Sequence, residues 1–221
     1  MEFENVVRTR YSARKFTLDP VPERTVRRIL ELAQCTPSWC NCQPWHVLVT
    51  RGAATERFRE AMLAHVRSGA RPNPDFAFPA AYEGIYRDRR KVCGVQLYQS
   101  LGIGKDDRAA ASEQALENFR LFGAPHVAIV TTAQRLGVYG ALDCGLYIQT
   151  FLLAARDSGV DTIAQAALAS HPDFVRQHFG LPPERKVVCG ISFGYADATH
   201  PIHAYRTERA SLSEAVRFVD E

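Results

Sequence analysis

Four cations and a hydroxyl group stand close together near the N-terminus, in the stretch Arg8-Thr-Arg-Tyr-Ser-Ala-Arg-Lys-Phe16. Arg10, Ser12 and Arg14 alternate along it, so an extended backbone would place their side chains on one side. Planar guanidinium groups beside a hydroxyl suit a phosphate or another delocalised anion. A solvated basic face is the ordinary alternative for a short run of this kind. The choice between them depends on the other motifs of the chain.

Three further stretches follow in order. A loop rich in proline and polar residues comes first, Pro37-Ser-Trp-Cys-Asn-Cys-Gln-Pro-Trp45. The second is Asp161-Thr-Ile-Ala-Gln-Ala166, and the third is the C-terminal run Arg206-Thr-Glu-Arg-Ala-Ser-Leu212. Taken singly, the loop could be only a helix-to-strand connector and the C-terminal run only a charged tail.

Together the four stretches resemble the nitroreductase family of FMN enzymes. The first matches the family's R-x-S-x-R-x-F opening, the loop matches P-S-x-x-N-x-Q-P-W, and the tail matches R-x-x-R-x-x-L. The stretch 161–166 is similar to the turn whose backbone N–H faces flavin N5, with Gln165 where many relatives have Glu and Ala166 where they often have Gly. The resemblance spans most of residues 5 to 219 and is weak over 67–110.

The resemblance implies a role for each matching residue. Arg14 would face the N1/O2 edge of the flavin and the N–H of Ala166 would face N5, so these two are the predicted catalytic residues. Amide side chains both donate and accept, as a ribityl chain and a pyrimidine edge require; this suits Asn41 and Gln43. The phosphate would be held by Arg10, Ser12, Arg206 and Arg209. The other predicted cofactor-binding residues are Tyr11, Pro37, Ser38, Trp39, Arg120 and Gln165.

Hydrophobic periodicity predicts the elements that position these motifs. Apolar residues at 26, 29, 30 and 33 follow helical spacing, and this first helix should end near Thr36 because Pro37 follows. Further helices are predicted at 52–66, 113–121 and 172–180, and strands at 46–50, 123–130 and 186–195. The stretch 139–155 is apolar nearly all round, which predicts a helix buried on most faces. It resembles the family's central helix, which packs in the dimer interface.

Residues 67–110 form the variable part of the chain. The run 68–79 is rich in proline and glycine and predicts an irregular excursion. Helical pieces are predicted at 82–91 and 95–101, as parts of a mobile, lid-like insertion. Phe78, Tyr82 and Tyr86 are candidates for the substrate pocket, with an ordinary surface helix as the alternative. Gly102-Ile-Gly-Lys105 lacks the spacer of a phosphate loop, which favours a helix-capping turn.

Composition argues against several other classes of protein, namely membrane, secreted, nucleic-acid-binding and metal-binding proteins. A chain of 221 residues with 46% hydrophobic and 23% charged residues is typical of a soluble globular protein. The formal charge of +3 is too small to indicate nucleic acid binding. We find no apolar run of membrane-spanning length, no secretory signal, and no cysteine or histidine spacing typical of a metal site. Six cysteines without such spacing favour reduced thiols and a cytoplasmic location.

The sequence therefore predicts one α+β domain over residues 1–221, with a mostly antiparallel central sheet flanked by helices. The resemblance implies an intertwined homodimer with two FMN sites at its interface. It also implies a ping-pong reaction in which NAD(P)H delivers hydride to flavin N5 and a nitroaromatic or quinone-like compound then takes two electrons. A reductive dehalogenase, a flavin-consuming enzyme of the same superfamily and a non-catalytic flavin-binding protein remain as alternatives.

Overall fold

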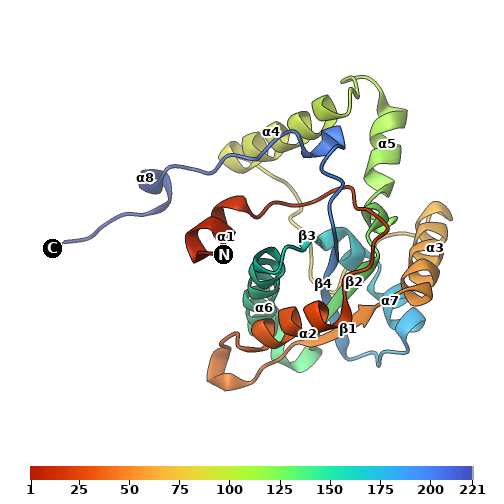
Figure 1. Ribbon diagram of the computed structural model, residues 1–221, viewed down its shortest axis with the longest axis vertical. Coiled ribbons are helices and arrows are strands. Elements are labelled where there is room, and N and C mark those ends of the chain that lie inside the picture. Colours follow the sequence, from red (N-terminus) through yellow and green to blue (C-terminus); the bar gives the residue numbers. More distant parts are fainter. Residues whose placement is uncertain (221) are drawn as a thin grey trace.

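A four-stranded antiparallel sheet lies at the centre of the computed structural model, which describes residues 1–220 (Figure 1). The strands are β1 (His46–Thr50), β2 (His126–Ala133), β3 (Asp161–Gln165) and β4 (Arg185–Gly194), in the spatial order β1-β2-β4-β3. Every neighbouring pair is antiparallel. The predicted α+β class and antiparallel sheet are confirmed.

Helices cover both faces of this sheet. On one face, α2 (Glu23–Gln34) and α6 (Gly137–Asp157) pack together, and α2 buries Val26, Ile29 and Ala33 as the periodicity predicts. On the other face, Phe58 and Met62 of α3 (Ala53–Arg67) form a second core with α7 (Pro172–Phe179). α7 stops at Gly180 in the left-handed conformation, with φ of 63°.

Two elements differ from the expectation. The helix expected at 113–121 is α5 (Arg108–Leu116), because the Asp107 side chain caps its N-terminus by accepting from the Ala110 N–H at 2.9 Å. The chain then turns at Leu121 and Phe122, both buried and both at positive φ. Where a turn was expected at 161–166, residues 161–165 form strand β3 because they pair with β4, and Ala166 opens the 3-10 helix η4 (Ala166–Ser170).

The insertion consists of an irregular segment and one exposed helix. Residues 68–79 contain no helix or strand, as predicted. The helix expected from residue 82 begins at Gly84, and α4 (Gly84–Ser100) is one continuous helix where two pieces were expected. None of its residues is buried, and it rests on the 3-10 helix η5 (Pro201–His203). Gly102, with φ of 66°, lies in the turn that ends α4, which confirms the predicted capping turn.

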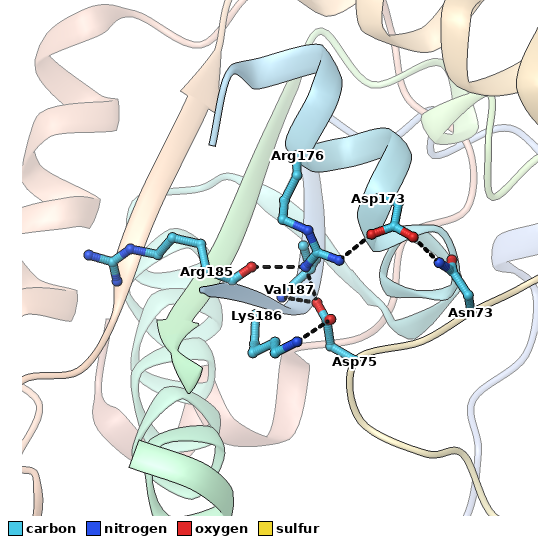
Figure 2. Close-up of polar contacts among 7 residues, drawn as sticks. All are labelled: Asn73, Asp75, Asp173, Arg176, Arg185, Lys186 and Val187. Atoms are coloured by element: carbon cyan, nitrogen blue, oxygen red, sulfur yellow. Dashed lines mark hydrogen bonds and ion pairs between the residues drawn. The ribbon is translucent and has the colours of Figure 1, made fainter. Parts of the chain in front are cut away.

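A buried ionic cluster fixes the beginning of the insertion to the domain (Figure 2). The Asp75 carboxylate accepts from the Val187 N–H at 2.8 Å and pairs with Arg176 at 2.6 Å and Lys186 at 3.2 Å. Only 4% of the Asp75 side chain is exposed. Within the described chain, residues 76–82 make no backbone hydrogen bond. The excursion is therefore anchored at Asp75 and runs unsupported from there to α4.

One face of α6 is uncovered in the single chain, contrary to the expected burial on most faces. Val138, Leu142 and Leu146, four residues apart, are 73%, 59% and 46% exposed. By length and composition alone the segment 134–157 could cross a membrane, but its other face packs on α2 and the sheet. The C-terminal segment extends away from the domain (Figure 1) and carries α8 (Leu212–Ala215) and exposed apolar side chains at Phe218 and Val219.

Candidate active site

The first motif runs along the edge of the sheet after α1 (Phe3–Thr9). Ser12 forms a bridge with Thr162 of β3, and the Ala13 N–H donates to the Thr162 carbonyl at 3.0 Å. Ala13 and Phe16 are buried, which anchors the segment on the domain. The polar side chains of Arg10, Ser12 and Arg14 face a cavity.

This cavity has a volume of about 830 Å³ and brings the two ends of the chain together. The structure places six of the predicted phosphate-site and neighbouring residues in its lining, from both the first motif and the C-terminal run. They are Arg10, Tyr11, Ser12, Arg14, Arg206 and Arg209. Cys93 of α4 and Gln149 of α6 also line it, and neither was anticipated from the sequence.

All of the charged residues that line the cavity are arginines. None of its lining residues is acidic, and within residues 1–220 none of Arg10, Arg14, Arg206 and Arg209 makes an ion pair. Burial, together with the nearby Arg209 cation, lowers the pKa of Arg10. Mutually repelling guanidinium groups beside a hydroxyl are stabilised by a bound dianion, so this donor set fits a phosphate monoester such as that of FMN.

Contacts from one histidine join the two arginine-bearing segments. The Arg206 guanidinium lies 4.0 Å from the centre of the Tyr11 ring and donates to the His203 carbonyl at 2.8 Å. His203 Nε2 in turn accepts from the Arg14 N–H at 3.0 Å. This role could not be predicted from the sequence, because His203 lies in a proline-containing loop with no motif around it.

The predicted loop 37–45 presents most of its polar side chains to solvent. Asn41 and Gln43 have φ of 55° and 43°, and the Ser38 hydroxyl accepts from the Gln43 N–H at 2.9 Å. The Gln43 amide donates to Asn41 Oδ1 at 3.2 Å, and the Trp39 side chain is 66% exposed. Pro37 is exposed at the start of the loop. The polar side chains thus point to the surface and not into the core.

The loop contacts the first turns of α6, whereas the cavity reaches this helix at Gln149. The Trp39 N–H donates to Asp143, near the start of the helix, at 3.2 Å. Arg156, near its end, donates to Thr9 Oγ1 at 3.1 Å and pairs with Asp161 at 3.2 Å. Asp143 and the cavity-lining Gln149 are six residues apart, which is about 9 Å along the helix at 1.5 Å per residue. No residue of the loop 37–45 lines a described cavity of the single chain.

The segment that follows β3 lies at the same edge as the first motif. Ala166 is exposed and opens η4, which sits close on β4 because a Cβ at Gly190 would come within 2.3 Å of Leu168. The Gln165 side chain turns inward instead: its amide donates to the Asn118 carbonyl at 2.8 Å, and it accepts from the Ser192 hydroxyl. Only the backbone of Gln165 is left for a cofactor.

Arg120 is engaged with acidic neighbours. It pairs with Glu113 at 2.9 Å and with Glu117 at 2.7 Å, and these hydrogen bonds raise its pKa. Together with Arg14 it lines a smaller cavity of about 370 Å³ between α5 and the first motif. Arg14 therefore borders two adjoining cavities, whereas Arg120 is charge-compensated in this chain.

The three candidate substrate residues lie in or next to α4 and are exposed. Phe78 and Tyr82 belong to the unsupported excursion and Tyr86 to the first turn of α4. The guanidinium of Arg90 lies 5.2 Å from the centre of the Tyr82 ring. None of the three lines a described cavity of the single chain.

Comparison with known proteins agrees with this fold and site. The model of the nitroreductase family matches residues 7–195. The chain is 40% identical to nitroreductase NfnB of Mycolicibacterium smegmatis, over 97% of this chain and 92% of the relative. It is 37% identical to a 4-nitrobenzoate reductase of Nocardioides sp. (strain LMS-CY), over 98% and 90%. The chain therefore belongs to the nitroreductase family.

A solved structure of such a relative superposes closely. The crystal structure of the FMN-dependent nitroreductase NfnB from Mycobacterium smegmatis, in complex with NADPH, matches with a TM-score of 0.93 at 39% identity. The match covers 98% of this chain and 97% of that one. The fold recognised from the four motifs is confirmed.

Proposed function

We propose that this protein is an FMN-dependent oxidoreductase that takes hydride from NAD(P)H and reduces nitroaromatic compounds. The four uncompensated arginines of the 830 Å³ cavity carry this proposal, because they match the terminal phosphate of FMN in charge and hydrogen-bonding capacity. The relatives support the remainder: NfnB is named an FMN-dependent nitroreductase and was solved with NADPH, and the Nocardioides protein is named a 4-nitrobenzoate reductase.

The chain's own residues would bind and orient the cofactor. The phosphate would be held by Arg10, Ser12, Arg206 and Arg209. The Arg206 guanidinium would be held in place by its contact with the Tyr11 ring. When bound, FMN accepts a hydride at N5 and passes two electrons to the substrate. Arg14 lies where the two cavities adjoin and is assigned to the N1/O2 edge, where its cation stabilises the negative charge that reduction places there. The Ala166 N–H is assigned to N5.

We assign a homodimer to the active form. The exposed apolar face of α6 and the apolar C-terminal segment would both be covered by a second copy of the chain. The absence of the loop 37–45 from the lining of the cavity has the same explanation: Asn41 and Gln43, with Ser38 and Trp39, would reach the flavin of the partner subunit. The site would then be incomplete without the second chain.

The substrate would enter beneath α4. Phe78, Tyr82 and Tyr86 present aromatic surface on the loosely held insertion, which suits stacking with a flat nitroarene. The insertion contacts the rest of the described chain through Asn73, Asp75 and α4, and α4 packs on η5 and not on the sheet. The free thiols of the described chain suit a reducing cytoplasm.

Two half-reactions test this function on the purified protein. Anaerobic mixing with NADPH should bleach the flavin absorbance rapidly, and addition of 4-nitrobenzoate should restore it. A carrier without turnover would bleach slowly or not at all. A flavin that is bleached by NADPH but is not reoxidised by nitroarenes, while quinones or halophenols do reoxidise it, would refute the assigned substrate class.

A further inference from the structure

His203 is held at both ring nitrogens by backbone groups of two different segments. Its Nε2 accepts from the Arg14 N–H at 3.0 Å, and its Nδ1 lies 2.9 Å from the Asp197 carbonyl. A carbonyl only accepts, so Nδ1 must carry the proton. The ring is therefore a neutral imidazole of one defined tautomer.

The same residue is tied to the C-terminal arginine. The His203 carbonyl accepts from Arg206 at 2.8 Å, and the His203 ring meets the edge of Tyr11 at 5.5 Å between ring centres. Tyr11 in turn lies against the Arg206 guanidinium. One residue thus contacts Arg14 and Tyr11 from the N-terminal motif and Arg206 from the C-terminal motif.

We propose that neutral His203 is a positioning residue. It holds the two arginine-bearing segments in the relative position in which their side chains bind the FMN phosphate. This inference rests on the proposed function of the cavity. His203 does not line the cavity itself, so its effect on the cofactor passes through Arg14 and Arg206.

The surroundings of the ring oppose its protonation. Burial lowers the pKa of His203, and the cation of Arg206 and the ring of His200, when protonated, act in the same direction, whereas the hydrogen bond to Asp197 and the charge of Asp161 raise it. The net direction is downward. Arg14 and Tyr11 complete the groups that face the ring. An imidazolium could not accept from the Arg14 N–H, so acid would release that segment.

The direct test is FMN affinity of the apoprotein, measured by flavin fluorescence between pH 5 and 8. His203→Ala should weaken FMN binding about tenfold at pH 7.5, the effect of roughly one lost hydrogen bond. His203→Gln keeps an acceptor for the Arg14 N–H and should remain within about threefold of the wild type. Both variants should lose less affinity on acidification than the wild type does.

Controls separate this effect from other titrations. The FMN phosphate ionises near pH 6, but it does so equally for every variant. His178→Gln reports on acid effects that do not involve the cavity, since burial also lowers the pKa of His178 and it packs on Phe58 in the second core. Circular dichroism at each pH checks that the variants are folded.

Equal affinity of the wild type and His203→Ala at pH 7.5, or parallel pH curves for all variants, would overturn the positioning role. A wild-type protein that binds no FMN at any pH would instead refute the proposed function, and this inference with it.

Discussion

Arg14 occupies a different position from the other arginines of the cavity, because it also borders the smaller cavity beside α5. A guanidinium about 4 Å from the reduced flavin contributes on the order of 4 kcal/mol at an effective dielectric constant near 20, before solvent reduces it. If half survives, Arg14→Ala should lower the midpoint potential of bound FMN by about 40 to 50 mV, since about 30 mV corresponds to 1.4 kcal/mol. Hydride transfer should slow accordingly.

The potential must be measured on protein saturated with FMN, because weaker cofactor binding would also slow the reaction. Arg14→Lys serves as the matched control, since it keeps the charge and loses only the planar fork. An unchanged potential in Arg14→Ala would mean that Arg14 binds the phosphate or the solvent, and that the flavin lies in another orientation.

His126 makes folding stability depend on pH. Its Nε2 accepts from the Val21 N–H at 3.0 Å and its Nδ1 lies 3.2 Å from the Thr50 carbonyl, so the folded protein needs the neutral ring. Burial lowers its pKa below the unfolded value near 6.5. The stabilisation is therefore fully present above about pH 6.5 and is lost as the pH falls through the lower folded pKa.

Urea unfolding at pH 7.5 and pH 5 should thus show a lower midpoint in acid, and His126→Gln should reduce that difference. The exposed His46 provides the control, because His46→Gln should leave the difference unchanged. Equal pH dependence in all three proteins would show that His126 does not govern the acid response.

At the scale of elements, the insertion depends on Asp75 (Figure 2). Asp75→Asn removes one member of a buried ionic cluster and leaves Arg176 and Lys186 without that carboxylate, which should cost about 3 kcal/mol of unfolding free energy. Trypsin should then cut faster at the basic residues of α4, Arg87, Arg89, Arg90 and Lys91.

Asp173→Asn is the matched comparison, because Asp173 pairs with the same Arg176 but is 70% exposed. It should cost less than about 1 kcal/mol and leave the cleavage rate unchanged. Similar losses in both variants would indicate that the cluster does not anchor the insertion.

Elements with strong local signals could be predicted from the sequence. The periodic α2, the glycine-terminated α7 and the apolar strands β1 and β4 form where expected, and β2 begins three residues later than predicted. β3 was missed because its five residues are defined by pairing with β4 and carry little pattern of their own. α5 was displaced because the capping Asp107 outweighed an apolar run that turns instead at Leu121.

The site was predictable where a motif names the residue. The arginines of both ends were expected to converge, and the structure brings them to one cavity. His203, Cys93 and Gln149 could not be predicted, since their roles come from tertiary neighbours. Nor could the inward turn of Gln165, which depends on Asn118 and Ser192 from distant parts of the chain.

At the scale of the whole molecule, the exposed face of α6 is the surface that a second chain would cover. Leu142→Glu should place a charge in that interface and give a monomer in sedimentation experiments, with weakened FMN binding because the partner's loop is lost. Glu60→Gln, at an exposed position of α3, is a surface control that should remain dimeric. A folded, FMN-loaded wild-type monomer at micromolar concentration would refute the dimer.

The central claim is that the arginine-lined cavity binds the FMN phosphate, and titration of the apoprotein with FMN and with riboflavin tests it most directly. The two ligands share the ring and the ribityl chain and differ only in the phosphate. Charge-assisted hydrogen bonds contribute about 1.5 to 3 kcal/mol each, so two of them predict an affinity for FMN at least about a hundredfold higher. Equal affinities for FMN and riboflavin would contradict the account.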